Sequence, residues 1–458
     1  MPMASSRTIG YRARPEPLWK SRQSFFTEVA LFILGVAGYF SVNLIGALPG
    51  SEVILLPMLP ILLLAKGNRA FDRQYLMFYI LAGGWFIGTQ IADTYNGIWI
   101  VLRMKGTARI VFFILDFVAL AILLNNKTRR LVIFALSIAV VLVLSSWQSF
   151  GGDINIQWKF GLSQGLSIFA LLGSSYFYAK GKYRICFFIS FVLAALNLHY
   201  GFRSQLAIHF VAAVLIWPHS AKIRKGREVF RGRQDTTRIL TLLFLAGSAA
   251  YVANASIKFA AKHDFFDESQ NSKFISQAEG DYGVLVGGRP ETLVAIQAIR
   301  DNPIIGHGSF PEGMKYIQLK HDIQYEHGYS ESDEPEDAET ETPVIPTHSH
   351  LTLAWVEGGI LGGLCWIYIL ILTVRGILRV TALRPHLAPL YSYLLINFLW
   401  DILYSPFGSF NRIRAAFCIL LSYSLLKAPM AVTLQVRGPQ VKMLSPRRPL
   451  RLRNRAAH

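Results

Sequence analysis

Apolar runs long enough to cross a bilayer recur along almost the whole chain. A membrane-spanning helix needs about 20 apolar residues. Hydrophobic residues make up 52% of the 458 residues and charged residues only 16%, whereas soluble domains carry about 25% charged residues. The sequence therefore predicts an all-α integral membrane protein, and it excludes a soluble enzyme, a coiled coil and a disordered scaffold. About twelve transmembrane helices are expected, at residues 25–47, 52–65, 74–92, 108–125, 130–148, 161–179, 184–200, 203–217, 239–256, 350–374, 387–404 and 411–427.

The basic residues favour one side of this arrangement. An even number of spans puts both ends of the chain on the same side, where the tails and loops hold most of the 46 Lys and Arg residues. The positive-inside rule makes that side cytoplasmic. The net charge of +18 is then a sign of topology, because nucleic-acid binding would need a basic patch on a soluble face. All three cysteines lie in apolar runs, which predicts neither a disulfide framework nor a zinc site.

The large outer loop is expected to contain two short helices and an acidic flap. Within the outer loop, Pro290 and the apolar residues Leu293, Ile296 and Ile299 predict a short amphipathic helix over 289–301. A second short helix is expected around 312–321, and the acidic composition of 326–341 predicts a solvated flap. The whole chain is expected to divide into five segments. They are a basic cytoplasmic N-tail (1–24), nine spans (25–256), a large outer loop (257–349), three spans (350–427) and a basic cytoplasmic C-tail (428–458).

Two arginines are candidates for binding an anion. Arg203 stands at the start of an expected span, where an arginine is either functional or paired, or reaches the membrane surface with its long side chain. Arg289 follows two glycines and precedes the helix expected from Pro290. Backbone amides, the positive helix end and a guanidinium together suit phosphate oxygens; an ordinary loop arginine is the alternative.

Histidine and carboxylate candidates lie in or next to the expected spans. His348 and His350 precede and open the span at 350. A neutral histidine can accept a proton from a hydroxyl, although an interfacial histidine without a task is the alternative. Positions i and i+2 of a helix face different ways, so no metal site is expected from this pair. Asp116 and Glu357 fall within spans, where a carboxylate is functional by default or is simply paired.

Several basic residues are expected on the outer side, although most Lys and Arg residues lie on the cytoplasmic side. Arg412 and Arg414 lie at the outer end of the last span and could add to an anion site. Arg103 and Lys105 also fall on the outer side. A solvated loop or an ion pair with Asp93 or Asp153 would explain them, and a bound anion is the alternative.

Three stretches, in this order, resemble the bacterial O-antigen ligase and O-antigen polymerase family. They are Arg203-Ser204, Gly287-Gly288-Arg289, and His348-Ser349-His350-Leu351 continuing to Trp355-Val356-Glu357-Gly358-Gly359. The run from Asp301 to Phe310 also looks like the loop of this family. Many ligases have Asn after the motif histidine where this chain has Ser349, and the first motif often reads Ser-Arg where this chain has Phe202-Arg203. These departures leave the branch of the family open.

The resemblance implies a GT-C-like, metal-independent glycosyltransferase of the bacterial inner membrane that needs no cofactor. Such an enzyme acts on the periplasmic face. It moves a glycan from an undecaprenyl-diphosphate carrier to a hydroxyl acceptor, which is a saccharide for polymerases and a lipid A core sugar for ligases. Carried over to this chain, Arg203 and Arg289 would bind the diphosphate and His348 would act on the acceptor, as a base or by orienting it. Glu357, His350, Arg412, Arg414 and Asp116 are further substrate-binding candidates.

Two other classes of membrane protein compete with this interpretation. A transporter or flippase for lipid-linked glycans would depend on polar residues near the membrane midplane, of which Asp116 is the main example. A sensor would carry its function in the outer loop and the tails, and would tolerate substitution of the motif residues.

Overall fold

A computed structural model of the chain describes residues 18–43, 46–149, 154–216, 289–326 and 343–428, with the single residues 247, 255 and 259. The span expected at 239–256, the Gly287-Gly288 pair, the acidic flap from 327 and both tails lie mostly outside the described residues. The described helices are α1 (Leu18–Ala37), α2 (Gly50–Lys66), α3 (Leu76–Tyr95), α4 (Ile100–Leu124), α5 (Thr128–Ser149), α6 (Ile154–Gln157), α7 (Ser163–Ala179), α8 (Tyr183–His199), α9 (Arg203–Ile216), α13 (Pro290–Asp301), α14 (Met314–Glu326), α15 (His350–Leu383), α16 (Ala388–Tyr404) and α17 (Ser409–Lys427).

The prediction of a helical, membrane-type architecture is confirmed in this coarser form. Within the described ranges, five helices are long and apolar enough to cross a membrane, and a lipid bilayer is the partner that such helices fit. They cover Gly50–Arg69, Arg73–Tyr95, Ile100–Leu124, Thr128–Trp147 and His350–Leu383. A small antiparallel hairpin of β1 (Ser41–Asn43) and β2 (Ala47–Pro49) occupies the end of the span expected at 25–47. The chain turns there because Gly46 adopts a positive φ and Pro49 precedes α2.

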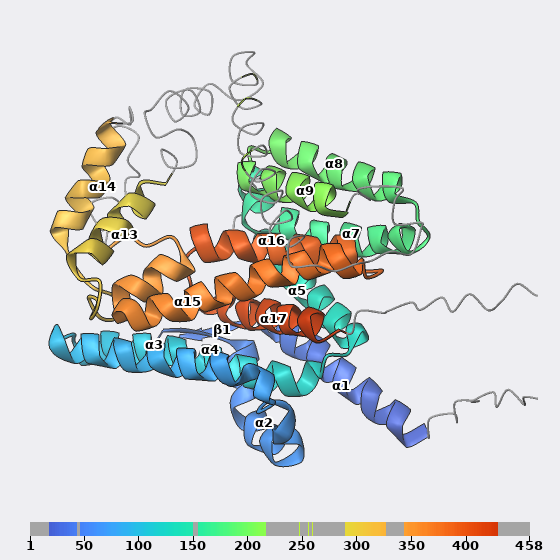
Figure 1. The fold of residues 1–458 in the computed structure, drawn as a ribbon, viewed down its shortest axis with the longest axis horizontal. Coiled ribbons are helices and arrows are strands. Elements are labelled where there is room, and N and C mark those ends of the chain that lie inside the picture. Colours follow the sequence, from blue (N-terminus) through green and yellow to red (C-terminus); the bar gives the residue numbers. More distant parts are fainter. Residues whose placement is uncertain are drawn as a thin grey trace, which may run out of the picture.

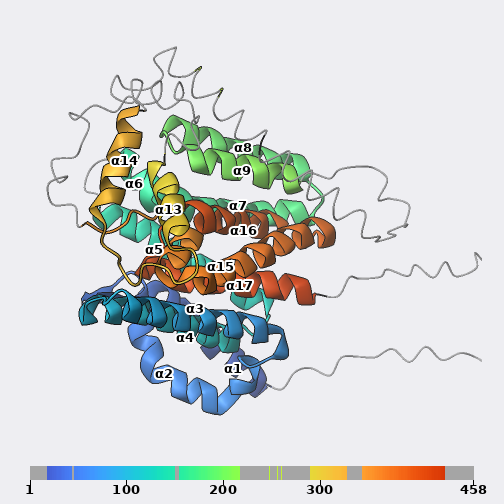
Figure 2. The ribbon, with the colours of Figure 1, turned by 60° about the vertical axis from the view of Figure 1, so that its left-hand side comes forward.

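The helices form a layered bundle with α15 at its centre. Figures 1 and 2 show α8 and α9 on one side, α3 and α4 on the other, and α15, α16 and α17 between them. Trp85 of α3, Phe113 of α4 and Trp366 of α15 are fully buried and pack against one another. Aromatic side chains bury large areas and prefer these tilted and stacked contacts, so they hold the central layer together.

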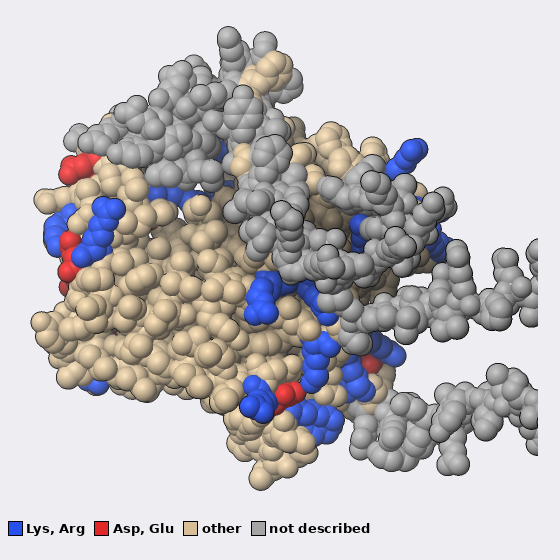
Figure 3. Space-filling model, in the orientation of Figure 1, with Lys and Arg blue, Asp and Glu red and all other residues tan. Residues whose placement is uncertain are grey.

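Charge is unevenly distributed over the surface. Figure 3 shows a broad uncharged face over α3, α4 and α15, with most of the visible Lys and Arg gathered at one end of the helices. At that end Lys427, which closes α17, pairs with Asp72 of the α2–α3 connection at 3.0 Å. Basic residues from connections far apart in sequence therefore share one end of the bundle.

Helix α15 contains a break that the sequence analysis does not predict. Its 34 residues run past the expected end at 374 and finish at Leu383. Gly359 departs from helical geometry with φ +59°, and a Cβ at this position would lie 2.0 Å from the Ile304 carbonyl oxygen. The break makes room for the 302–310 loop, whose Ile304 carbonyl accepts a hydrogen bond from the Ile360 amide.

The two short helices expected in the outer loop are confirmed as α13 and α14, but the expected apolar face of α13 is wrong. The structure buries Val294, Ala295 and Ala298 completely, whereas Ile296 is 38% exposed. The two alanines allow the helix to approach closely the side chains of Tyr316, Ile345 and Val356, with which they form a small core. Close packing against α14 and α15 determines which face of α13 is buried, and the larger side chains lie at the margin of that face.

Candidate functional site

The C-terminal end of α16 collects several of the candidate residues. Ser349 is the N-cap of α15, accepting a hydrogen bond from the Thr352 amide at 3.1 Å. Its hydroxyl also donates to the Ile402 carbonyl of α16 at 2.9 Å. His348, the preceding residue, is exposed. The chain around His348 is thus fixed at this helix end, while its imidazole remains accessible from outside.

Arg289 reaches the same helix end from the outer loop. It directly precedes α13, and its guanidinium donates to the Tyr404 carbonyl, at the last residue of α16. The guanidinium also lies over the rings of Trp400 and Tyr404, at 5.4 and 5.5 Å from their centroids. Burial lowers the pKa of Arg289, and the negative charges of Glu291 and Asp401 oppose that shift. Arginine loses its proton only far above neutral pH, so the side chain supplies a fixed positive charge.

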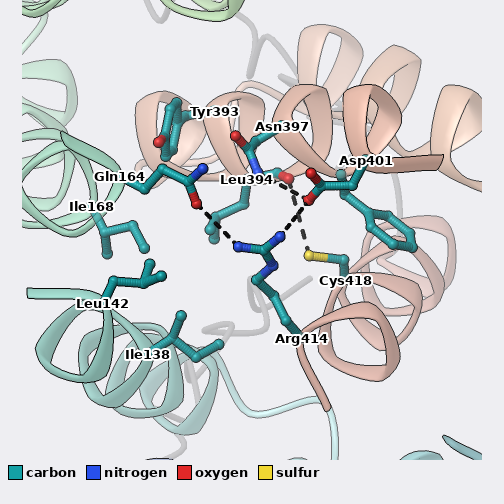
Figure 4. Close-up of a pocket in the computed structure, with 11 residues that line it drawn as sticks. Ile138, Leu142, Gln164, Ile168, Tyr393, Leu394, Asn397, Asp401, Arg414 and Cys418 are labelled. Atoms are coloured by element: carbon teal, nitrogen blue, oxygen red, sulfur yellow. Dashed lines mark hydrogen bonds and ion pairs between the residues drawn. The ribbon is translucent and has the colours of Figure 1, made fainter. Parts of the chain in front are cut away.

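A buried carboxylate that the sequence analysis missed holds Arg414 at this end. Asp401 accepts a hydrogen bond from Arg414 Nη2 at 2.8 Å and another from Ser405 Oγ at 2.8 Å. Arg414 Nη1 donates to Gln164 Oε1 of α7 at 3.0 Å, so two of its nitrogens bond within the protein (Figure 4). The sequence does contain a signal for this residue, because Asp401, like Asp116, is an acid inside an expected span.

A small cavity adjoins this ion pair. It has a volume of about 20 Å³ and is lined by Gln164, Asn397, Asp401 and Arg414 together with apolar side chains (Figure 4). A space of this size accommodates about one water molecule, and four polar neighbours are enough to bind it.

Helix α9, which begins at Arg203, is joined to α16 by a polar chain. Gln205 Nε2 donates to Asn397 Oδ1 at 2.6 Å, and Tyr393 OH donates to Gln205 Oε1 at 3.1 Å. The ring of His209 stacks on Tyr393 with centroids 4.9 Å apart. Arg203 itself is partly buried at the first position of α9. The polar chain therefore fixes the start of α9 against the helix that also anchors Arg289.

His350 points away from this surface. Its imidazole is buried among aromatic rings, with Trp366 and Phe407 both at 4.9 Å between centroids. Neither ring nitrogen bonds to another side chain among the described residues. The structure thus separates the two motif histidines into one exposed side chain and one core side chain.

Glu357 belongs to the contact that docks the 302–310 loop. It forms a buried ion pair with Arg109 of α4 at 2.8 Å, and its other oxygen accepts the Phe310 amide at 3.2 Å. The Arg109 guanidinium lies 4.3 Å from the centroid of the Phe310 ring. Glu357 is therefore paired, which was one of the two alternatives from the sequence, and its role here is to position the loop.

Asp93 of α3 and two glycines also fix the position of the 302–310 loop. Asp93 accepts hydrogen bonds from the Ser309 amide and from its hydroxyl. Gly306 and Gly308 adopt φ of +85° and +86°, which disfavours other residues. The glycines of this stretch thus serve a tight backbone fit beside α15.

Arg412 and Asp116 lie in a second cluster. Arg412 forms a bidentate pair with Glu52 of α2, with contacts of 2.7 and 2.6 Å. Asp116 of α4 interacts electrostatically with both partners, and its carboxyl group lies within hydrogen-bonding reach of Glu52. Residues two apart on a helix face different sides, so Arg412 contacts α2 while Arg414 contacts α7 and α16. The structure does not bring Arg412 and Asp116 together with Arg289.

Comparison with known proteins assigns no function to this site. The chain matches no protein-family model and no curated protein. No group of three or more His, Cys, Asp or Glu suited to a metal ion occurs within the described ranges. The motifs and their positions in the fold therefore carry the functional argument.

Proposed function

We propose that this protein is a membrane glycosyltransferase that moves a glycan from an undecaprenyl-diphosphate carrier to a hydroxyl acceptor during synthesis of a cell-surface polysaccharide. The observation that carries the proposal is the meeting of two motifs at one helix end. Arg289 and Ser349, the neighbour of His348, each donate to a carbonyl in the last turn of α16. These motifs are 60 residues apart in the sequence, and the resemblance assigns them to donor and acceptor.

The proposed reaction needs little beyond charge and placement. The acceptor oxygen attacks the anomeric carbon, the bond from this carbon to the diphosphate oxygen breaks, and the carrier diphosphate leaves. Arg289 and Arg203 offset the negative charge that develops on the diphosphate. His348 takes the proton of the acceptor hydroxyl, a contribution of about 10²–10⁴-fold. Its exposure suits contact with a large hydrophilic acceptor.

The location that we propose is the bacterial inner membrane, with about twelve spans, both termini cytoplasmic and the 257–349 loop on the periplasmic side. It is supported by the bias of Lys and Arg in the connections. It is further supported by the Lys427–Asp72 pair, which joins connections assigned to the same side.

The first experiment is the surface glycan profile of a deletion strain complemented with the wild-type protein or with His348→Ala. A ligase is indicated if long polymer stays on its lipid carrier and is missing from lipid A. Single repeats in place of long chains indicate a polymerase of O-antigen or exopolysaccharide. An unchanged profile in the deletion strain contradicts the proposal.

A second set of variants separates the transferase from a transporter. Arg289→Ala and His348→Ala should abolish the product while the protein still inserts into the membrane. A transporter or flippase would instead depend most on Asp116, so Asp116→Asn is the comparison. Failure at Asp116 alone, with the other two variants active, would favour transport.

A further inference from the structure

A groove on the outer side of α3 and α4 is separate from the proposed reaction site. Its volume is about 550 Å³, within the range of about 300–1,000 Å³ for ligand sites. The wall is mostly apolar and aromatic, and the side towards α4 is polar. The apolar part is Phe86, Ile87, Ile91 and Tyr95, and the polar side includes Gln90 and Arg103.

Arg103 is held on the polar side by neutral groups. Its Nε donates to Gln90 Oε1 at 3.1 Å, and Gln90 Nε2 donates in turn to Thr107 at 2.7 Å. Asp93, one of the acids expected to pair with Arg103, bonds instead to Ser309. No carboxylate among the described residues forms an ion pair with Arg103, whereas Arg109, Arg412 and Arg414 all have one. Arg103 thus lines the groove without a counter-charge from the described parts of the chain.

The surroundings of the groove are those of a membrane interface. Both helices belong to the five that could cross a membrane. Tyr95 is 70% exposed and Trp99 is 65% exposed beside the helix connection, and such aromatic residues mark the level of lipid headgroups. From Tyr95 down to Phe86 an α-helix rises about 14 Å, which is close to half of the roughly 30 Å hydrocarbon core. The groove therefore runs over much of the depth of one leaflet.

We propose that this groove binds an anionic phospholipid, with its phosphate on Arg103 and one acyl chain along Ile87 and Ile91. A guanidinium presents a fork of donors that matches phosphate oxygens, and the exposed apolar side chains below it match a hydrocarbon chain. The occupant is a lipid rather than a free phosphate ion because most of the lining side chains are apolar or aromatic. This inference does not depend on the proposed glycosyl transfer.

The test is lipid binding to the purified full chain in detergent, followed by native mass spectrometry. The probes are dioleoylphosphatidylglycerol, the matching diacylglycerol without phosphate, and inorganic phosphate. Wild type should bind the phosphatidylglycerol about tenfold more tightly than Arg103→Gln does, which corresponds to about 1.4 kcal/mol. Lys105→Gln, two residues away on the same helix and outside the groove lining, is the matched control and should bind like wild type.

A second variant covers the case in which Arg103→Gln does not fold. Ile91→Trp leaves the charge in place and fills the apolar groove, so it should also weaken phosphatidylglycerol binding. Equal losses in Arg103→Gln and Lys105→Gln would indicate unspecific attraction and overturn the proposal. Competition by millimolar inorganic phosphate, or equal binding of the diacylglycerol, would overturn it as well.

Discussion

Two buried ion pairs in this protein join side chains that are distant in sequence. Arg109 pairs with Glu357 and Arg412 with Glu52. A sequence can indicate that an arginine within a span needs a counter-charge. It cannot identify the acid that provides this charge, because the partners are hundreds of residues apart. Arg103 and Arg289 differ from these, since no ion pair forms between either side chain and an acid of the described residues.

Glu357 tests how much such a pair stabilises the fold. Glu357→Gln leaves the Arg109 guanidinium buried without a counter-charge, which costs about 3–5 kcal/mol. The expected result is a clearly lower midpoint of thermal unfolding in detergent. Replacing both partners together, Arg109→Met with Glu357→Leu, should recover much of the loss. A single variant as stable as wild type would mean that the pair contributes nothing.

Arg289 is the test of the anion site. Arg289→Lys keeps the positive charge but loses the bidentate fork and the planar contact with Trp400 and Tyr404. We expect at least a tenfold drop in transfer by membranes supplied with lipid-linked donor. Arg300→Lys, on the exposed side of the same α13 helix, should retain full activity. Equal activities of the two variants would contradict a special role for Arg289.

At the element scale, the sequence predicts most helices and misses the shape of one of them. The start of α15 at His350 agrees with the expected span, and so do the ends of α7, α16 and α17. The Gly358–Gly359 break could not be predicted, because it is imposed by the docked 302–310 loop. The orientation of α13 was missed for a similar reason: close packing selected alanines over larger apolar residues.

The glycine at the break gives a direct test of loop docking. Gly359→Ala would place a Cβ within 2.0 Å of the Ile304 carbonyl oxygen, in a backbone conformation that alanine avoids. We expect faster hydrogen exchange over 302–310, measured by mass spectrometry. Gly173→Ala in α7, where a Cβ meets nothing within 4 Å, should leave exchange unchanged or slow it slightly. Unchanged exchange in Gly359→Ala would show that the loop does not depend on this contact.

The contact between α13 and α14 should depend on pH. Asp301 accepts hydrogen bonds from Lys315 and Tyr316 of α14, and these partners lower the pKa of Asp301 to about 2. Because the unfolded carboxyl titrates near 3.8, the stabilisation is complete above that pH and is lost as the pH falls towards 2. The protection factors of α13 and α14, which correct for the pH dependence of intrinsic amide exchange, should therefore fall over this interval in wild type. They should be independent of pH there in Asp301→Asn.

At the scale of the whole molecule, the broad uncharged face and the basic end of the bundle agree with a protein embedded in lipid. The sequence predicted this class from its apolar runs alone, because length and composition are sufficient for it. It could not predict that Arg289 and Ser349 meet at α16, since that contact depends on how the outer loop folds back.

The proposed topology can be tested with single cysteines. All three natural cysteines are buried, so they should react little with a membrane-impermeant maleimide. Arg300→Cys in α13 should react in intact spheroplasts, whereas Asn68→Cys in the α2–α3 connection should react only after the membrane is permeabilised. Both positions are exposed, which makes them a matched pair. Labelling of both in intact spheroplasts would contradict the proposed sidedness.

The two arginines of α17 have a consequence for motion. Positions two apart on an α-helix point about 200° apart, and here each is tied to a different neighbour, Arg412 to α2 and Arg414 to α16. A rotation of α17 about its own axis that lengthens one ion pair strains the other, whichever its direction. We therefore expect α17 to act as a fixed axis, so that conformational change during a reaction cycle takes place in the helices and loops around it.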